Sequence, residues 1–401
     1  MHPMTPLLSI EAALARVLAR ARPLEAERVP VAETAGRVLA EDVGSSVDLP
    51  PFPSSAMDGF AVRTADTPGR LPVVFRIAAG VPADRPLGPG EAMEISTGGA
   101  VPEGADAVVP IENVVLSDNE VEISEATPSG AHIRPVGGDV LAGAALLAAG
   151  TQIGPAQVGA LAAAGVAEVV CVRRPRVVVL STGTELRAPG EELAAGQIYE
   201  SNGPMLAAAV ASAGAVVVRI GPVPDDETAQ REALERGLQA DVLVSSGGVS
   251  VGPHDLVRRL SAELGVEEEF WGVAVRPGKP VSFGTRGRTL VFGLPGNPVS
   301  ALVAVELFVR PALLALQGAG DPGPRYESAR LAAPLRRRAE RDELARARTS
   351  RGADGTMLEP VSGQESHMIA RAAAADALVL VPQGEGELAA GDIVRYLPLR
   401  P

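Results

Sequence analysis

The 401-residue sequence contains very little lysine, cysteine, histidine or aromatic side chain. Lys279 is its one lysine, Cys171 is its one cysteine, and its four histidines are scattered. A single cysteine excludes an internal disulfide and any zinc or iron–sulfur site built from several thiolates. A nucleotide-binding P-loop would have to use Lys279, but proline follows that residue where the motif has Ser or Thr. The scattered histidines also leave no HExxH metal-binding helix.

The charge balance argues against two classes of partner. The net charge is −13, the pI is near 5.0, and the aromatic residues are one Trp, three Tyr and seven Phe. Nucleic acids and anionic membranes require clustered positive charge, and base stacking requires aromatic side chains. The N-terminal segment lacks the basic flank of a targeting peptide, and residues 140–172, although apolar, are interrupted too often for a membrane span. We therefore expect a cytoplasmic protein without a nucleic-acid or membrane partner.

The pattern along the chain predicts several domains. Residues 60–139 alternate short Val and Ile runs with Gly and Pro turns, which is typical of a small all-β domain. From Arg176 strand-like runs alternate with helical patterns, which predicts a three-layer α/β domain with a mostly parallel sheet. Short apolar runs return after Gln317 and predict a small terminal β domain.

Three loops that follow predicted strands of the α/β domain are rich in glycine and small polar residues. They are STGTE (181–185), SSGGVSVG (245–252) and GLPGNPVS (293–300). Glycines and a following helix suit an anion, although a tight strand-to-helix turn explains a Gly-Gly pair about as well. Asn297 and Pro298 fit the cap and first position of a helix, which is a structural explanation. Since ligands of such sheets bind outside the carboxyl ends of the strands, the three loops together predict a pocket.

Charged residues in these loops point to a phosphate-bearing ligand. Arg276 and Lys279 flank a Pro-Gly turn, and a solvated hairpin tip would explain two cations there. The chain uses arginine at every other basic position, however, and has its one lysine here. A lysine ammonium binds phosphate as a point charge, which favours a phosphate site. Asp226 and Asp255 are explained as helix-start residues, whereas Asp58 in SSAMDGF has no helix to cap. An anionic substrate beside several carboxylates requires a divalent cation, and oxygen ligands favour Mg²⁺.

Seven motifs taken together resemble one family. The sequence is similar to the molybdopterin molybdenumtransferases, the bacterial MoeA family, and to the C-terminal part of gephyrin, from Ala32 to Leu316 and more weakly beyond. The motifs are TAGRVLAEDV, PPFPSSAMDGFAVR, ISTGGAVPEGADAVVPIE, STGTEL, SSGGVSVGPHD, RPGKP and GLPGNPVSALV. The resemblance implies four domains: an extended linker (1–46 with 147–175), an inserted small β domain (47–146), an α/β molybdopterin-binding domain (176–322) and a C-terminal β barrel (323–401). It also implies a homodimer whose active site lies between subunits.

The reaction that the resemblance implies inserts molybdenum from molybdate into adenylylated molybdopterin with release of AMP, assisted by Mg²⁺. This is the last step of molybdenum cofactor biosynthesis, so the implied partners are the molybdopterin adenylyltransferase and apo-molybdoenzymes or their chaperones. The implied catalytic residues are Asp58, Thr97, Glu185, Asp225 and Asp255, and the metal ligands are Glu185, Asp225 and Asp255. The implied cofactor-binding residues are Arg134, Asp139, Ser246, Gly247, Gly248, Ser250, Arg276, Lys279, Pro295, Asn297 and Pro298.

The sequence departs from the family pattern at three positions and leaves two alternatives open. Thr184 stands where relatives often carry Asp, Gly272 where they often carry Lys, and Arg276 where they carry Lys. A tungstate-selective relative would share every motif, and a gephyrin-like scaffold would lack the Asp58, Glu185 and Lys279 set, which is present here. Two further features are expected to have no site role: the mixed-charge run of residues 336–348, read as a solvated face, and His367.

Overall fold

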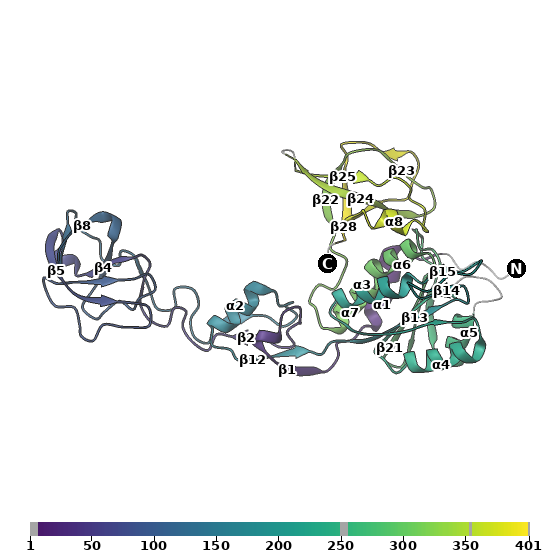
Figure 1. Ribbon diagram of the computed structural model, residues 1–401, viewed down its shortest axis with the longest axis horizontal. Coiled ribbons are helices and arrows are strands. Elements are labelled where there is room, and N and C mark those ends of the chain that lie inside the picture. Colours follow the sequence, from purple (N-terminus) through teal and green to yellow (C-terminus); the bar gives the residue numbers. More distant parts are fainter. Residues whose placement is uncertain (1–6, 249–255, 353–354, 400–401) are drawn as a thin grey trace.

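The computed structural model describes residues 7–248, 256–352 and 355–399, which form an elongated molecule (Figure 1). A small β domain lies at one end, a linker with helix α2 in the middle, and an α/β domain with a β barrel beside it at the other end. The chain runs out to the small β domain and returns, so the linker is built from two separate segments. This arrangement confirms the predicted multidomain α/β and β fold class.

The α/β domain is built on a six-stranded sheet of order β16-β13-β17-β21-β20-β18. The first four strands are parallel to one another, whereas the pairs β21–β20 and β20–β18 are antiparallel. The bounds are β13 (Arg176–Thr182), β16 (Val216–Val223), β17 (Val242–Ser246), β18 (Glu267–Trp271), β20 (Ser282–Arg286) and β21 (Thr289–Leu294).

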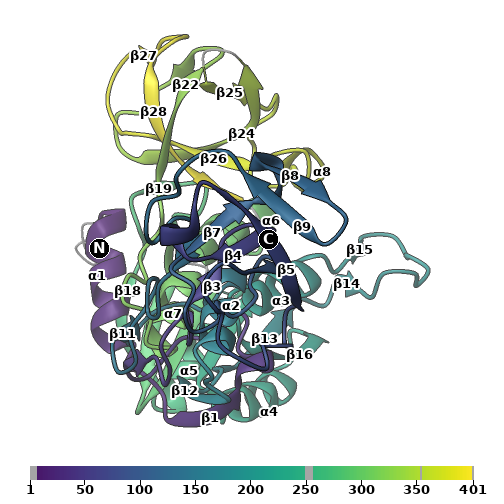
Figure 2. The same ribbon diagram turned by 90° about the vertical axis from the view of Figure 1, so that its left-hand side faces the viewer.

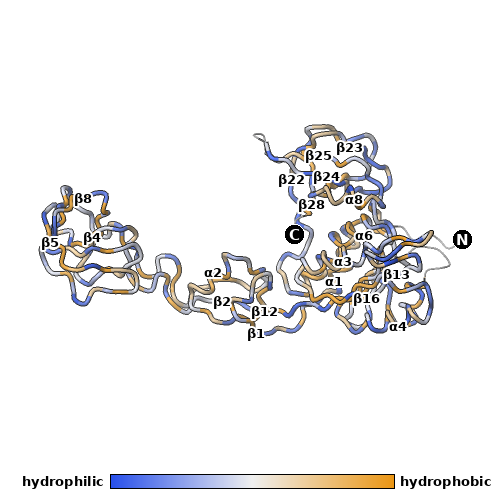
Figure 3. The backbone as a smooth tube through the Cα atoms, viewed as in Figure 1, coloured by the Kyte–Doolittle hydropathy of each residue, from blue (hydrophilic) through white to orange (hydrophobic). Residues whose placement is uncertain are grey.

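Alternation along these strands creates a core on each face of the sheet. In β13, Val177 and Val179 face one hydrophobic core while Val178 and Leu180 face the other, as the two-residue period of a strand requires. The first core is covered by α1 (Ile10–Arg20), α3 (Asn202–Ser212), α6 (Pro298–Ala304) and α7 (Arg310–Leu316), and the second by α4 (Glu227–Gly237) and α5 (Leu256–Glu263). Hydrophobic residues accordingly gather in the middle of this domain (Figure 3). The predicted three-layer arrangement is confirmed.

Local sequence explains where these helices begin. The Ser9 hydroxyl accepts a hydrogen bond from the Ala12 N–H (3.1 Å), and the Asp226 carboxylate accepts one from the Ala229 N–H (2.9 Å), as helix caps do. Helix α1 packs in the α/β core, although the sequence-based division assigns residues 1–46 to the linker. Helices α6 and α7 are joined by the π-helical turn η4 (Val305–Val309). Pro298–Leu316 is apolar and long enough to span a membrane, but 72% of its most apolar window is buried inside the protein, as in a core helix.

The linker and the small β domain form the extended arm. In the linker, β1 (Ala26–Pro30) pairs with β12 (Glu168–Val172), and α2 (Pro155–Ala163) packs beside them. The small β domain has a sheet of order β7-β4-β6-β5-β9-β8, seen at the front in Figure 2. Its strands are β4 (Gly59–Val62), β5 (Gly69–Ile77), β6 (Ala92–Ile95), β7 (Ala107–Pro110), β8 (Val114–Ser117) and β9 (Glu120–Ile123).

The C-terminal strands close into a barrel. The order β24-β25-β22-β28-β26 closes because β26 pairs again with β24, and β19 (Val275–Arg276) of the preceding domain pairs with β24 as well. The strands are β22 (Glu327–Leu331), β24 (Asp342–Gly352), β25 (Gly355–Pro360), β26 (Ala377–Val381) and β28 (Ile393–Pro398). The expectation of a solvated face at residues 336–348 is wrong for β24, because Glu343 and Arg346 are only 8% and 1% exposed.

Short elements lie within and between these domains. They are η1 (Val31–Glu33), β2 (Val43–Gly44), β3 (Ser54–Ser55), η2 (Thr64–Asp66), η3 (Ile111–Asn113), β10 (Ile133–Arg134), β11 (Ala145–Leu147), β14 (Leu186–Arg187), β15 (Ile198–Tyr199), β23 (Leu335–Arg336), α8 (Ile369–Ala372) and β27 (Glu387–Leu388). The β14–β15 segment projects sideways from the α/β domain in Figure 2.

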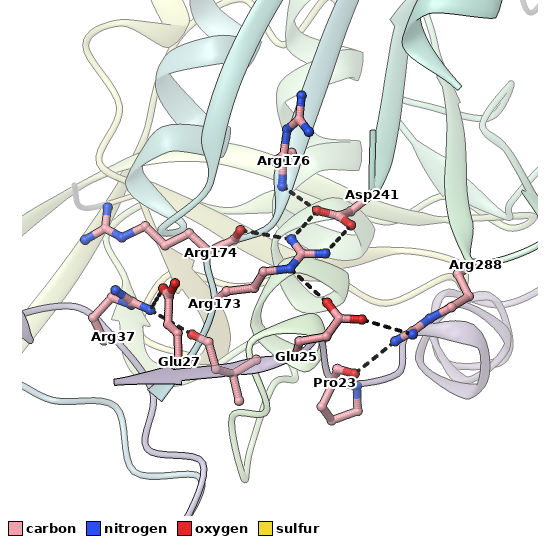
Figure 4. Close-up of polar contacts among 10 residues, drawn as sticks. Pro23, Glu25, Glu27, Arg37, Arg173, Arg174, Arg176, Asp241 and Arg288 are labelled. Atoms are coloured by element: carbon pink, nitrogen blue, oxygen red, sulfur yellow. Dashed lines mark hydrogen bonds and ion pairs between the residues drawn. The ribbon is translucent and has the colours of Figure 1, made fainter. Parts of the chain in front are cut away.

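Arg173 is the centre of a charge network where the linker meets the α/β domain (Figure 4). Its guanidinium donates two hydrogen bonds to the Asp241 carboxylate (2.7 and 2.8 Å) and a third to Glu25 (2.9 Å). Arg288 also binds Glu25 at 3.2 Å. Burial acts to raise the pKa of Asp241, but the hydrogen bonds and charge of Arg173, with the Arg176 N–H, outweigh it and hold that pKa below its usual value. The bidentate pair ties the segment after β12 to the start of β17.

Candidate functional site

The carboxyl ends of β13, β17 and β21 surround a pocket of about 750 Å³. All three loops singled out in the sequence reach it, as expected for ligand sites of such sheets. Of the predicted site residues, those on its wall are Glu185, Asp225, Ser246, Gly247, Gly248, Asn297 and Pro298. The other lining residues are Ser181, Thr182, Gly183, Leu186, Ile198, Tyr199, Glu200, Ser201, Asn202, Leu256, Gly296, His367 and Ile369.

Two carboxylates on the pocket wall are exposed. Glu185 follows β13, and Asp225 precedes α4. The Thr184 N–H and hydroxyl lie 3.3 and 3.4 Å from the same oxygen of Asp225, and the Asp225 N–H donates to the Thr184 hydroxyl (3.0 Å). Gln230 donates to the other carboxylate oxygen at 3.1 Å. Thr184, one of the three residues that depart from the family pattern, thus fixes the orientation of Asp225.

A third carboxylate, Glu200, is buried at 2% exposure. It accepts hydrogen bonds from the Ser181 hydroxyl (3.1 Å) and from the Gly203 N–H, and it pairs with Arg219 at 2.9 Å. These partners compensate the charge that burial would otherwise make costly. Glu200 was not among the predicted site residues, because nothing in the segment YESN distinguishes a buried acid from the exposed ones around it.

Asn202, at the start of α3, was not predicted either. Its side-chain amide donates to the Ser246 hydroxyl and to the Gly296 carbonyl, both at 2.7 Å. The first acceptor is the last residue of β17, and the second lies in the loop after β21. The sequence contains no local signal for Asn202, because Asn-Gly before Pro is typical of a turn and the two acceptors are 44 and 94 residues away.

The loop after β21 differs from its predicted geometry in one detail. Asn297 occupies the N-cap position of α6 and Pro298 the first turn, but the Asn297 side chain makes no capping hydrogen bond. It is exposed on the pocket wall instead. The side chain therefore has no structural partner at the helix end and is free to contact a ligand.

The C-terminal barrel also reaches the pocket. His367 and Ile369 line it, although His367 was expected to have no site role. The Val299 N–H donates to the Ser366 carbonyl (3.1 Å), which holds this barrel loop against α6. No local pattern in the chain indicates that residues so far apart in sequence come together.

Several predicted residues lie elsewhere. Within the described part of the chain, Arg276, Lys279 and Pro295 are not on the pocket wall, and the Arg276 guanidinium lies 3.9 Å from Glu343 of the barrel. Ser250 and Asp255 are outside the described residues. The described residues contain no group of three or more His, Cys, Asp and Glu that could hold a metal ion. The predicted metal ligands Glu185 and Asp225 share the pocket, so two of the three proposed ligands are brought together.

The four remaining predicted residues lie in or next to the small β domain, which Figure 1 shows at the opposite end of the molecule from the α/β domain. Asp58 accepts a hydrogen bond from the Thr97 N–H (2.7 Å), which joins two segments of the small β domain. Arg134 lies in β10, which pairs with β3 just before Asp58, and the Asp139 N–H donates to the Leu49 carbonyl. All four are exposed. One chain therefore forms two separate groups of the predicted site residues.

Three protein families match successive parts of the chain. Residues 8–165 match the MoeA N-terminal region (domains I and II), residues 178–315 a probable molybdopterin binding domain, and residues 328–399 the MoeA C-terminal region (domain IV). The pocket and its three loops lie mainly in the second match.

Relatives match nearly the full length. The chain is 40% identical over 393 residues to molybdopterin molybdenumtransferase 2 of Mycobacterium tuberculosis, covering 94% of this chain and 95% of that relative. It is 35% identical over 382 residues to molybdopterin molybdenumtransferase of Haemophilus influenzae, covering 94% of each. A crystal structure of the molybdopterin biosynthesis MoeA protein from Pyrococcus horikoshii superposes with a TM-score of 0.77 at 33% identity, covering 98% of this chain and all of that one.

Proposed function

Because the chain belongs to the MoeA family of molybdopterin molybdenumtransferases, we propose that it inserts molybdenum from molybdate into adenylylated molybdopterin and releases AMP. This reaction is the last step of molybdenum cofactor biosynthesis. The observation that carries the proposal is the pocket at the carboxyl ends of β13, β17 and β21, within the domain that matches a molybdopterin-binding family.

The pocket residues suit an anionic pterin nucleotide. The start of α3 lies on the pocket wall and contributes a positive partial charge there, while the Gly203 N–H of its first turn is already bound to Glu200 and Pro204 has no N–H. Gly247 and Gly248 line the pocket and have positive φ angles of 96° and 66°, a backbone conformation that glycine adopts readily. The exposed Asn297 amide can bind polar edges of the pterin or nucleotide.

A divalent cation, in our proposal Mg²⁺, would be held by Glu185 and Asp225, with Asp255 as a third ligand. The two described carboxylates are hard oxygen ligands, and Mg²⁺ in phosphate sites is often bound through one or two carboxylates with the substrate completing the shell. When bound, the cation would neutralise phosphate and oxyanion charge. The Thr184 and Gln230 hydrogen bonds to Asp225 would hold its carboxylate in place for this role.

The second group of predicted residues would act in trans. We propose a homodimer in which Asp58, Thr97, Arg134 and Asp139 of one subunit complete the pocket of the other. Their exposure in and next to the small β domain, away from the α/β domain of the same chain, supports this arrangement, because exposed side chains contribute little to the packing of their own domain. We place the reaction in the cytoplasm, with the molybdopterin adenylyltransferase as donor and apo-molybdoenzymes or their chaperones as acceptors.

The test is an AMP-release assay with purified protein, adenylylated molybdopterin and Mg²⁺, with and without molybdate. We expect release that depends on molybdate, and a fall of at least about a hundredfold in Asp58→Ala and in Glu185→Ala. Asp84→Ala, which removes another exposed carboxylate of the small β domain, is the control and should retain activity. AMP release unaffected by molybdate would contradict the function, and competition by tungstate would show which oxyanion is preferred.

Mixing the two inactive variants tests the dimer. If one site needs Asp58 and Glu185 from different subunits, half of the dimers after exchange are mixed, and each has one intact site. Activity should then return to about a quarter of the wild-type value. No recovery after demonstrated subunit exchange would show that both residues act within one chain.

A further inference from the structure

The first residues of α3 contact all three loops that form the pocket. The segment 200–203 follows the short strand β15 and enters the helix at Asn202. Its side chains and backbone bind Ser181 at the end of β13, Ser246 at the end of β17 and Gly296 after β21. Each of these three contact points lies on the pocket wall.

Glu200 connects the first loop to the helix. Its carboxylate accepts hydrogen bonds from the Ser181 hydroxyl and from the Gly203 N–H in the first turn of α3. The packing here leaves no spare space, because a Cβ on Gly203 would lie 2.7 Å from the Ser181 oxygen and 2.8 Å from a Glu200 oxygen. A buried carboxylate with this many partners can adopt only one position, so it fixes the start of α3 relative to β13.

Asn202 connects the other two loops to the same helix start. One amide nitrogen donates to both the Ser246 hydroxyl and the Gly296 carbonyl at 2.7 Å. The two loops also contact each other directly through the Gly247 N–H and the Leu294 carbonyl (3.2 Å). Asn202 therefore adds the contact that ties this pair of loops to α3, and through Glu200 to the loop after β13.

The second polar atom of Asn202 indicates that this residue is not there for stability. Its Oδ1 is buried and has no hydrogen-bond partner among the residues that the structure describes. A buried acceptor without a partner is destabilising and offsets much of what the two donated bonds contribute. Such a residue, which holds loops together but leaves an acceptor unpaired, is typical of a binding site in which the geometry of the loops matters more than the stability of the fold.

We infer that Asn202, supported by Glu200, is a positioning residue that holds the three pocket loops in the arrangement that binds the substrate. The inference rests on the proposed function and adds to it residues that were not among the predicted site residues. Asn202 acts through Ser246 and Gly296, and the adjoining Gly247 and Asn297 then lie where a ligand meets them. Small displacements of groups that position a substrate have large kinetic effects.

The matched variants are Asn202→Ala and Gln317→Ala. Gln317 is a buried amide whose nitrogen also donates to two oxygens, the Ala213 and Leu313 carbonyls at 2.8 and 2.9 Å, and it does not line the pocket. We expect Asn202→Ala to raise the KM for adenylylated molybdopterin about tenfold or more, with a thermal midpoint within about 2 °C of wild type. Gln317→Ala should lower the midpoint and leave the KM unchanged. Asn202→Asp keeps the shape but cannot donate, so it should behave as Asn202→Ala does.

Hydrogen exchange of the unliganded protein gives a readout that does not depend on the proposed reaction. We expect Asn202→Ala to speed exchange in residues 246–248 and 294–297, and Gln317→Ala to leave those segments as in wild type. Unchanged exchange and unchanged KM in Asn202→Ala would overturn the inference. An equal loss of thermal stability in the two variants, with KM unchanged in both, would also overturn it. Failure of the wild-type protein to release AMP, with the exchange result as expected, would instead contradict only the proposed function.

Discussion

Gly59 and Gly159 show that glycine is required at one position of the fold and not at another. A Cβ on Gly59 would lie 2.0 Å from the Val109 carbonyl oxygen, because β4 and β7 pair closely at that point. Gly159 lies inside α2, and a Cβ added there would meet no neighbouring atom within 4 Å outside its own helix backbone. The first position therefore requires glycine, whereas the second merely tolerates it.

Alanine at these two positions should have opposite effects. Gly59→Ala should destabilise the small β domain by about 3 kcal/mol, since backbone must move to admit the methyl group. Gly159→Ala should stabilise the protein by about 0.5–1 kcal/mol, because alanine is the better helix former. Hydrogen exchange of β4 and of α2 measures both. A Gly59→Ala domain as well protected as wild type would contradict the close approach of the two strands.

Two asparagines show how much of the site the sequence predicts at the level of single residues. Asn297 was predicted to cap α6, and it does occupy the N-cap position, but its side chain turns to the pocket. Asn202 was overlooked, because its two acceptors are 44 and 94 residues away in the chain. Local rules predict where a helix begins; they do not contain the long-range contacts that decide what a polar side chain binds.

At the level of elements, strand β24 and the loop that covers it also show that local sequence does not predict long-range contacts. Mixed charges in residues 336–348 predicted a solvated face, yet Arg346 is buried among the carbonyls of the loop 363–368. Its guanidinium donates to Gly363, Glu365 and Met368, and the Gln364 amide oxygen accepts from it too. Burial lowers the pKa of Arg346, with nearby acids opposing the effect. The strand was foreseeable, but its covering loop was not.

Arg346 should matter for the pocket as well as for the barrel, because the same loop carries His367. We expect Arg346→Lys to destabilise the barrel by about 3 kcal/mol, since a lysine ammonium cannot reach the same set of carbonyls and leaves buried acceptors unpaired. Exchange should also speed in residues 363–369. Arg348→Lys, an exposed neighbour on the same strand, is the control. Equal stability of both variants would show that the loop does not depend on the buried guanidinium.

At the level of the whole molecule, the order of the domains was foreseeable and their relative placement was not. Changes in composition near residues 60, 139, 176 and 317 indicated separate units, because each unit must bury its own apolar residues. The Arg173 network between linker and α/β domain could not be foreseen, since Glu25, Arg173 and Asp241 are spread over more than half the chain (Figure 4).

Acid should weaken this junction. The pKa of Asp241 is lowered in the folded protein, so its contribution to stability is present above the unfolded pKa of about 3.9 and is lost as the pH falls through the lower folded value. Asp241→Asn should lower the free energy of unfolding by about 2 kcal/mol at pH 7. The difference in this free energy between variant and wild type should become smaller below about pH 4. Urea unfolding followed by fluorescence of Trp271, the one tryptophan and part of the α/β domain, measures this difference. A difference independent of pH would exclude the ionised Asp241 as its source.

The single cysteine has a chemical consequence for an enzyme that delivers molybdenum. Cys171 is fully buried in the linker, and burial raises the pKa of its thiol, so the sulfur stays protonated and inaccessible. Soft metal centres seek thiolate ligands, and an accessible protein thiolate would compete with the pterin's own sulfur atoms for the incoming metal. Because the protein has no accessible thiolate, the pterin's own sulfur atoms face no competing protein thiolate for the incoming metal, and the selectivity of delivery follows from that absence.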